Sequence, residues 1–445
     1  MTDGRLARRL GTTSAVMITV GSVIGSGIFL KPLAIAQALP DAGWIFACWA
    51  ALGAVCLFGA FAYAELGAML PEAGGAYAFL REGWGRLPAF LYGWCLLLVI
   101  NTGTLAALSV AFAGTLATVV PIDPAVRPWV AVAMIALLAA VNHFGVGWGA
   151  VLQNATTFSK LLALAAIVVA GAWFATAGTG APPAEAAPAP PGPGLVAGFV
   201  AAAVAIFWAY EGWYQLPFNA AELRDPGRVL PRGLIWGIAI LIATYVAVNA
   251  IYLLVVPLGE MRVLGADVEV PRAAVTRIFG AGAGDGLALL ICLSVFGAAN
   301  PNLLCAPRAF FAMAEDGLMP RALTRVHPRW RTPTASIWLQ AAWAAVLVVY
   351  WQTFKDLTDY VVFASLIFYG LTVAAVYTLR RRRPDAPRPY RCFGYPWTPL
   401  VFLAVVAFVD VQSLLTEERR RHALVGLGIL ATGLPVYAVL RARRQ

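Results

Sequence analysis

Two apolar segments of this chain, each long enough to cross a lipid bilayer, are interrupted near their centres by glycine. The first contains Gly25-Ser26-Gly27, and the second contains Glu211-Gly212-Trp213. Hydrocarbon offers no partner to unpaired backbone groups, so a helix breaks at membrane depth only beside a cavity or another protein segment. The peptide groups released by such a break can bind a small polar ligand. The pattern therefore predicts a membrane protein that carries a polar solute, with its site between two broken helices.

Apolar stretches recur along almost the whole chain, because 61% of its 445 residues are hydrophobic and only 12% are charged. A soluble domain carries about 25% charged residues. A spanning helix needs about 20 mostly apolar residues. We therefore predict an all-α integral membrane fold with twelve transmembrane helices, at residues 12–37, 42–69, 84–118, 126–142, 150–176, 195–221, 233–257, 282–313, 334–352, 357–379, 396–415 and 423–440.

The basic residues are distributed unevenly over the segments that connect these helices. If the N-terminus is cytoplasmic, 22 of the 32 Lys and Arg residues fall in cytoplasmic tails and loops, eight fall outside, and Lys31 and Lys160 fall within helices. This bias follows the positive-inside rule. The net charge of +10 thus indicates a lipid bilayer and no nucleic acid partner. We predict a multi-pass protein of the cell (plasma or inner) membrane with both termini in the cytoplasm.

A segment at 177–194, rich in Ala and Pro, separates the first five predicted helices from the next five. Because five is odd, the second group must cross the membrane in the inverted orientation. A shift of 185 residues takes Gly27 to Gly212, so each group begins with a broken helix, as in an inverted-repeat transporter. We expect an N-terminal tail and first five-helix repeat at 1–176, an extracellular linker at 177–194, the second repeat at 195–379, and a cytoplasmic loop, helices 11 and 12 and the C-terminal tail at 380–445.

The sequence contains no visible catalytic or metal-binding constellation. The six cysteines lack metal-ligand spacing, and the three histidines fall at predicted helix ends or in loops. A phosphate-binding Walker motif is also missing, which argues against pumping driven by ATP. We therefore predict no enzymatic activity, no cofactor and no metal.

Four motifs occur in a fixed order along the chain: Gly21 to Phe29, Tyr63 to Leu66 with Pro71 to Tyr77, Phe207 to Trp213 with Glu222 and Asp225 to Arg228, and Arg308 to Gly317. In order and spacing they resemble the amino acid–polyamine–organocation (APC) superfamily over about residues 12–400. The Ala-Tyr-x-Gly-Trp core and a lysine in the fifth helix look most like the L-type amino acid transporter (LAT) family. The resemblance implies a LeuT-type fold of two inverted five-helix repeats plus two helices, with helices 1 and 6 discontinuous. It also implies exchange or uptake of amino acids.

The first glycine break offers donors for the carboxylate of an amino acid. A carboxylate in a dry site needs backbone N–H groups and the positive end of a helix dipole. Ser26 and Gly27 supply N–H groups, Ser26 adds its hydroxyl, and Gly25 lets the backbone approach closely. The alternative is that Gly21 and Gly25 serve close helix packing. The resemblance favours the ligand interpretation.

The ammonium group of the substrate needs acceptors, which unwound carbonyls can provide. The resemblance implies that these are the carbonyls of Val23, Trp208 and Glu211. It also puts Trp208 where the family has an aromatic gate over the substrate, the alternative being that this ring only packs in the core. Glu211 departs from the glycine found in some members, and a carboxylate at membrane depth is usually functional.

Three roles are open for Glu211: pairing with a cation, titrating during transport, or bracing the break by accepting backbone hydrogen bonds. We favour the brace. A Glu211 that instead faced the cavity would favour basic substrates. Lys160 lies in the fifth predicted helix at a depth of about 15 Å. By resemblance, its ammonium replaces a sodium ion of related transporters and bonds to carbonyls near Gly21 or Ser22. A coupling role, in which Lys160 exchanges a proton, stays open.

Several further polar side chains within the predicted helices either line the cavity or tie helices together, and we favour the second role: Asn101, Thr102, Asn300, Asn302, Ser365 and Tyr369. We also expect residues 258–281 to form a short amphipathic helix over the outer mouth. The charged loop at 315–331 is expected to lie against the inner gate.

The sequence thus predicts a secondary amino acid transporter that exchanges small to mid-sized neutral L-amino acids by alternating access, independently of sodium. The alternatives are proton-coupled symport on the same scaffold and, in other classes, an amino-acid-binding receptor or a membrane enzyme. Heteromeric members of the family join a heavy chain through a cysteine after the third helix. The corresponding loop here, Val119 to Pro128, has no cysteine. We therefore expect no disulfide-linked heavy chain, and a chain that works alone or as a homodimer.

Overall fold

The structure, a computed structural model, describes residue 8 and residues 10–177, 194–264, 269–350 and 354–442. Within these ranges it consists of helices and connecting turns, with one isolated bridge between Leu10 and Leu223. Ten helices are long and apolar enough to cross a membrane, and two shorter apolar helices accompany them. The chain therefore has the architecture of an all-helical multi-pass membrane protein. Most of the predicted linker at 177–194 lies outside the described residues.

The elements follow one another as α1 (Thr12–Val23), α2 (Gly27–Leu30), α3 (Pro32–Ala38), α4 (Ala42–Met69), α5 (Ala76–Trp84), α6 (Arg86–Cys95), η1 (Leu96–Ile100), α7 (Asn101–Leu116), α8 (Arg127–His143), α9 (Val146–Thr176), α10 (Leu195–Ala209), η2 (Trp213–Glu222), α11 (Pro226–Val255), α12 (Leu258–Val263), α13 (Val270–Phe279), α14 (Ala283–Leu304), α15 (Pro307–Glu315), η3 (Arg321–Thr324), α16 (Thr334–Tyr350), α17 (Phe354–Arg382), α18 (Trp397–Leu415) and α19 (Glu417–Ala442).

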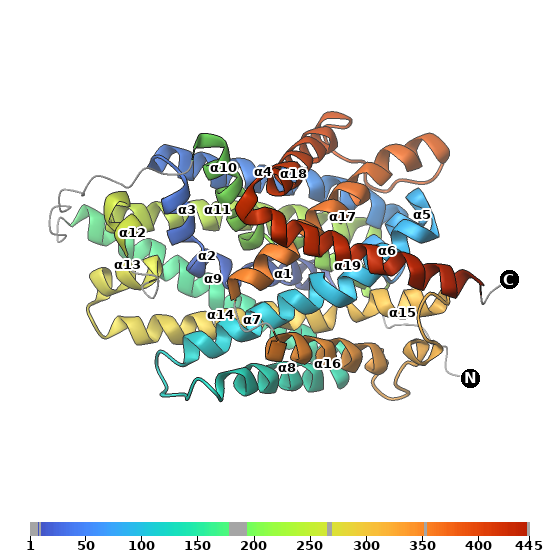
Figure 1. The fold of residues 1–445 in the computed structure, drawn as a ribbon, viewed down its shortest axis with the longest axis horizontal. Coiled ribbons are helices and arrows are strands. Elements are labelled where there is room, and N and C mark those ends of the chain that lie inside the picture. Colours follow the sequence, from blue (N-terminus) through green and yellow to red (C-terminus); the bar gives the residue numbers. More distant parts are fainter. Residues whose placement is uncertain (1–7, 9, 178–193, 265–268, 351–353, 443–445) are drawn as a thin grey trace.

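Most of the long helices lie side by side along the long axis of the molecule (Figure 1). Near the middle of the bundle, α1 packs against α11, α9 and α14. One end of the bundle, on the left of Figure 1, is covered by α12 and α13, and we call it the α12 end. The opposite end, near α5 and α15, is the α15 end. After the first break the chain runs to the α12 end, because α3 contacts α12; after the second, η2 contacts α5 and α15.

Helical geometry is lost at both glycine positions. The first helix stops at Val23 and resumes at Gly27, so residues 24–26 are not helical. In the second segment, α10 stops at Ala209 and η2 begins after Gly212. Gly212 has a φ of +111°, a left-handed conformation that glycine adopts without the steric cost of a Cβ atom. Both breaks lie inside the bundle and consist of buried residues.

The two breaks pack directly against each other, and this contact requires glycine. A Cβ atom on Gly27 would lie 2.4 Å from the Cα of Ala209, and one on Gly212 would lie 2.7 Å from the carbonyl oxygen of Ser22. Gly25 is similarly close to α14, since its Cβ would lie 2.9 Å from the Cβ of Ala298. These close contacts directly support a packing role for the glycines. Packing does not exclude ligand binding, because a glycine has no side chain and its peptide groups stay uncovered.

Three predicted elements differ in detail. The third predicted helix is interrupted by the π-helical turn η1 between α6 and α7. The single amphipathic helix expected at 258–281 is two helices, α12 and α13; Pro271 lies in the first turn of α13, where its missing N–H costs nothing. The predicted helix at 282–313 is divided into α14 and α15, and Pro307 begins the second of them.

Replacing Gly27 by alanine should lower the free energy of unfolding by about 1–3 kcal/mol, because the added methyl group overlaps the backbone of Ala209. Thermal unfolding of the detergent-purified protein measures the effect. Gly114→Ala is the matched control, since a Cβ atom on Gly114 meets nothing within 4 Å. Equal unfolding temperatures for the two variants would contradict the close contact between the breaks.

Candidate functional site

The first break contains backbone amides without a protein partner. Among the described residues, the N–H groups of Gly25, Ser26 and Gly27 have no acceptor in hydrogen-bond geometry. The Ser26 side chain is only 1% exposed, so these amides lie away from bulk water. A buried amide without a partner costs free energy, and a bound anion would recover that cost. The three residues predicted to bind the substrate carboxylate therefore lie in one place, and their N–H groups are available.

The carbonyls at the same break are, in contrast, bonded to side chains from two other helices, α9 and α14. Lys160 Nζ of α9 donates to the Gly21 oxygen over 3.1 Å and to the Ile24 oxygen over 2.7 Å. Ser294 of α14 also donates to the Ile24 oxygen, over 3.2 Å. The break is thus polarised: its carbonyl oxygens accept hydrogen bonds from the protein, whereas its N–H groups have no protein partner among the described residues.

Lys160 is 1% exposed and lies against the first broken helix, as the sequence predicts. Its acceptor Gly21 was expected, whereas the second acceptor is Ile24 and not Ser22. The Ile24 carbonyl lies beyond the last residue of α1, which leaves it available to a side-chain donor. A buried ammonium with two carbonyl acceptors holds α9 and α1 together.

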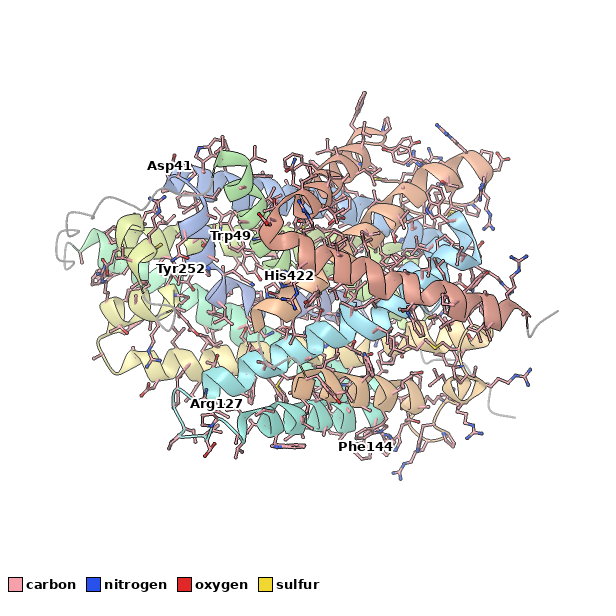
Figure 2. The ribbon with its side chains drawn as sticks, in the orientation of Figure 1. Asp41, Trp49, Arg127, Phe144, Tyr252 and His422 are labelled. Carbon is pink, nitrogen blue, oxygen red and sulfur yellow. The ribbon has the colours of Figure 1, made fainter. Side chains whose placement is uncertain are left out.

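Tyr245 of α11 connects the two breaks, and the sequence analysis missed it. Its hydroxyl lies 3.1 Å from the Val23 oxygen and 3.0 Å from the Ala209 oxygen, one from each broken segment. Rings of Trp49 and Tyr210 surround it, and Figure 2 shows Trp49 inside the bundle. A tyrosine within an apolar run carries no local signal for such a contact, because its acceptors are distant in sequence.

Trp208 lies over the first break. Its indole Nε1 donates to the Ser26 hydroxyl over 3.3 Å, and the side chain is 4% exposed. The Trp208 carbonyl accepts the N–H of Glu211 over 3.0 Å, and the Val23 carbonyl lies within reach of Tyr245. Two of the three carbonyls expected to bind an ammonium group therefore already have protein partners. The Val23 carbonyl keeps a second lone pair for a further donor, whereas the Trp208 carbonyl also accepts the N–H of Tyr210.

Glu211 is buried at the second break and faces α17. Its Oε1 accepts hydrogen bonds from Ser365 (3.2 Å) and Tyr369 (2.7 Å). These are side-chain donors, whereas a brace built from backbone donors was expected; the donors come from the neighbouring helix because α17 packs beside the break. The carboxylate thus connects the second break to α17.

The side chains of Asn101, Asn300 and Asn302 tie helices together, as the sequence analysis favours, whereas Thr102 bonds within its own helical segment. Asn101 of α7 donates to the Asn302 carbonyl of α14 over 2.9 Å, and Gln215 of η2 donates to the side chains of both. Asn300 donates to the Gly149 carbonyl over 3.0 Å. Thr102 donates to the carbonyl of Leu97, five residues earlier, beside the π-helical turn.

At the α15 end, ion pairs connect segments that are far apart in the sequence. Arg81 of α5 contacts Glu72 and Asp316, each at 2.8 Å, and the Tyr77 hydroxyl donates to Asp316 over 2.6 Å. Burial tends to raise the pKa of Asp316, but the hydrogen bonds from Tyr77 and Arg81 outweigh it and hold that pKa below its usual value. The contact therefore persists at neutral pH and is lost only as the pH falls through the lowered pKa. The start of the loop at 315–331 thus takes part in closing this end.

A second ion pair of the α15 end is fully buried. Arg308 of α15 contacts Glu222 of η2 at 3.1 Å, and both side chains are 1% exposed. Asn219 also donates to this carboxylate, over 2.6 Å. The backbone of Glu222 is held as well, because its carbonyl accepts the N–H of Leu10 over 3.0 Å. Removing either charge alone would leave its partner buried and uncompensated.

A helical multi-pass membrane protein whose buried polar site lies between two broken helices has the form of a secondary transporter. Comparison with known proteins agrees with this class. Residues 10–421 match the family model described as amino acid permease. The chain belongs to this family, and it is an amino acid transporter.

Three relatives illustrate the similarity. The serine/threonine exchanger SteT of Bacillus subtilis (strain 168) is 30% identical over 444 residues, which cover 99% of each chain. The large neutral amino acids transporter small subunit 2 of Homo sapiens is 32% identical over 97% of this chain and 80% of its own. The b(0,+)-type amino acid transporter 1 of Homo sapiens is 30% identical over 92% of this chain and 82% of its own. These relatives are named as transporters or exchangers.

Tyr245→Phe should reduce both stability and transport, because the carbonyls of Val23 and Ala209 lose their shared donor. We expect a loss of about 1–3 kcal/mol in the free energy of unfolding. Tyr252→Phe is the control on the same helix, since the buried Tyr252 hydroxyl has no hydrogen-bond partner among the described residues. Unfolding temperature and initial uptake rate are the measurements, and equal values for the two variants would contradict the bridging role.

Proposed function

We propose that this transporter exchanges small to mid-sized neutral L-amino acids across the cell membrane by alternating access, without sodium. The observation that carries the proposal is the polarised first break, in which the amides of Gly25, Ser26 and Gly27 lack protein partners while the carbonyls are bonded. Such a break can bind the carboxylate of a zwitterion. The names of two relatives, an exchanger of serine and threonine and a transporter of large neutral amino acids, support the substrate class.

The same proposal includes the membrane arrangement. Ten long helices and two shorter apolar ones are compatible with twelve crossings in a LeuT-type fold. Residues 1–176 and 195–379 would form two inverted five-helix repeats, joined by a linker at 177–194 and followed by helices 11 and 12 within 380–445. With both termini in the cytoplasm, the α15 end is the cytoplasmic side and the α12 end is the extracellular side. The ion pairs of the α15 end, of which Arg308–Glu222 is fully buried, then close the inner gate.

The substrate would bind with its two charged groups at different parts of the breaks. Its carboxylate takes the N–H groups of Gly25, Ser26 and Gly27 and the Ser26 hydroxyl. Its ammonium group takes the carbonyls of Val23, Trp208 and Glu211 as acceptors, with Val23 and Glu211 as the more available of the three because the Trp208 carbonyl accepts two backbone N–H groups. Trp208 covers the site. Because the Glu211 carboxylate is occupied by two hydroxyl donors from α17, it does not demand a cationic side chain.

Sodium independence rests on Lys160. Its ammonium lies between α9 and α1 and contacts the carbonyls of Gly21 and Ile24, an arrangement that a bound cation would otherwise provide. A permanently attached ammonium needs no dissolved ion to join the two helices. The position thus supports a structural cation that replaces sodium.

Proton-coupled symport is the second candidate, and the buried Glu211 is the observation that favours it. A carboxylate that connects the second break to α17 could release this contact on protonation. The two candidates differ in what drives the substrate. Exchange needs an amino acid on the opposite side, whereas symport responds to an imposed pH gradient.

We propose that the chain needs no disulfide-linked heavy chain and works alone or as a homodimer. The loop between α7 and α8 contains no cysteine, and all six cysteines of the chain are buried. An exposed thiol for an intermolecular bridge is therefore not offered by this chain.

Counterflow in proteoliposomes tests the function. Purified protein should accumulate labelled serine or leucine only when unlabelled amino acid is present inside, and replacing sodium by potassium should change the rate by less than about twofold. Accumulation driven by a pH gradient in empty vesicles would instead establish symport. Binding without accumulation would identify a receptor.

Lys160→Ala should reduce exchange by about tenfold or more, because two buried carbonyls lose a charged donor. The amount of protein in the membrane should stay close to the unmodified level. Exchange by the variant is measured with and without sodium. Sodium stimulation of the unmodified protein would contradict the idea that the lysine replaces the ion.

Glu211→Gln should leave the affinity for neutral amino acids within about a few-fold, because an amide oxygen still accepts from Ser365 and Tyr369. Under the exchange mechanism, the dependence of the rate on a pH gradient is also unchanged. Competition by a panel of amino acids measures the affinity. Abolished binding of neutral substrates would contradict the brace.

A further inference from the structure

Lys31 is a second buried lysine, and the proposed substrate contacts do not use it. It joins α2 to α3 and is 9% exposed. It follows Gly27 by four residues, about one helical turn further toward the α12 end. A lysine at membrane depth is costly and is a functional candidate by default.

The Lys31 side chain contacts two further elements of the site. Its Nζ donates to the Thr358 hydroxyl of α17 over 3.0 Å. The same atom lies 6.0 Å from the centre of the Trp208 ring of α10, within the range of a cation–π interaction. One ammonium group therefore joins three segments, α2–α3, α10 and α17, on the α12 side of the first break.

We propose that Lys31 is a positioning residue of the outer gate, which holds these three segments over the substrate site and must leave Thr358 when the site opens to the outside. The proposal rests on the proposed function, which assigns the α12 end to the outside. Trp208 is held from two sides, by the Ser26 hydroxyl and by the Lys31 ammonium. Releasing Lys31 frees the outer attachment of this ring and separates α17 from α2–α3.

The two buried lysines are attached differently, which separates their roles. Both acceptors of Lys160 are backbone carbonyls at the end of α1, next to the scaffold helix α9. Lys31 donates to a side-chain hydroxyl on another helix. A side-chain hydroxyl can rotate away without breaking a helix, so this contact is suited to forming and breaking in each transport cycle.

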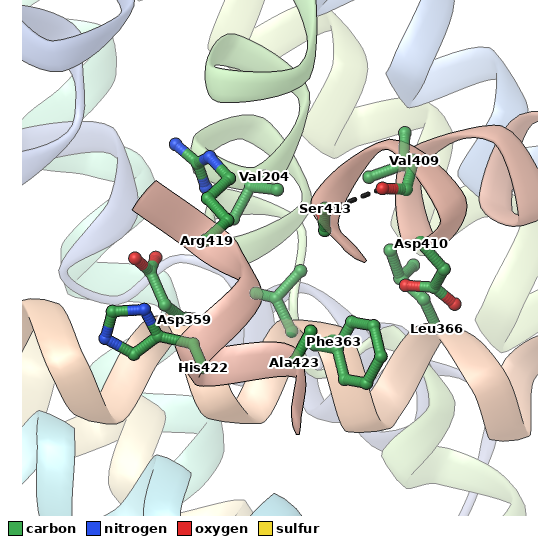
Figure 3. A pocket seen from close by; sticks show the side chains of 11 residues that line it. Val204, Asp359, Phe363, Leu366, Val409, Asp410, Ser413, Arg419, His422 and Ala423 are labelled. Carbon is green, nitrogen blue, oxygen red and sulfur yellow. Dashed lines mark hydrogen bonds between the residues drawn. The ribbon is translucent and has the colours of Figure 1, made fainter. Parts of the chain in front are cut away.

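A small pocket borders the gate among α10, α17, α18 and α19. Val204, one turn before Trp208, and Asp359, next to Thr358, line it. Figure 3 shows Asp359 and His422 on one side of the pocket and Asp410 on the other. Its volume of about 20 Å³ is close to that of one water molecule, so movement of α10 or α17 also displaces the side chains packed around it.

The proposal predicts opposite effects on the two faces of the membrane. A contact formed only when the outer side is closed stabilises the closed and inward-facing states, so its loss favours the outward-open state. The KM for external amino acid should then fall, the KM for internal amino acid should rise, and kcat should fall because the gate closes less readily. A residue that only stabilises the fold would change both KM values in the same direction.

The experiment compares Thr358→Val, which keeps the shape and removes the hydroxyl, with Thr358→Ser, which keeps the hydroxyl. Full-length protein is reconstituted in one orientation, and exchange of labelled serine is measured with the external and internal concentrations varied in turn. We expect the ratio of internal to external KM to increase about tenfold for Thr358→Val and to stay near the unmodified value for Thr358→Ser. Lys31→Met should behave like Thr358→Val.

An equal ratio for Thr358→Val and Thr358→Ser would overturn the gate, even if Lys31→Met fails to fold. Parallel changes of both KM values in Thr358→Val would overturn it too, since they indicate a structural role only. Failure of the proposed function has a different signature: the unmodified protein would then move no amino acid, whereas failure of the gate leaves its exchange intact.

Discussion

Each peptide group freed by the first helix break must find a partner inside the protein, because the bilayer core offers none. The structure provides partners for the carbonyls but not for the amides of the break, within the described residues. Lys160, Ser294 and Tyr245 supply donors to the carbonyls at or beside the break, while the amides of Gly25 to Gly27 have no acceptor in the described part of the chain. The helices that supply the three donors, α9, α14 and α11, all pack against α1.

The second constraint is the distance between the two breaks. Gly27 lies against Ala209, and Gly212 lies against Ser22, at separations that exclude a side chain. Each broken segment thus presents a glycine to the backbone of the other. Such reciprocal contact lets a change in one segment reach the other directly, which is the coupling that a transporter needs if both halves are to move around one bound solute.

Much of this could be predicted from the sequence, and the limit has a physical cause. The broken segments at the glycines and the apolar segments follow from rules about backbone groups in hydrocarbon, which act locally. The contact of Lys160 with Gly21 is instead implied by the family resemblance. The roles of Tyr245, Ser294 and the pair Lys31–Thr358 follow from neither, because each depends on which helices become neighbours, and residues more than 200 positions apart leave no local signal. Glu211 is an intermediate case. The free-energy cost of burying its carboxylate predicts that it has a hydrogen-bond partner, but this cost does not indicate which helix provides the partner.

The hydroxyl of Tyr245 carries one hydrogen atom, yet it lies within reach of two carbonyl oxygens, one on each broken segment. It can satisfy only one of them at a time. Strengthening its bond to one segment therefore weakens its hold on the other, and the hydrogen passes between them by rotation about a single bond. The two segments are in this sense competitors for one donor.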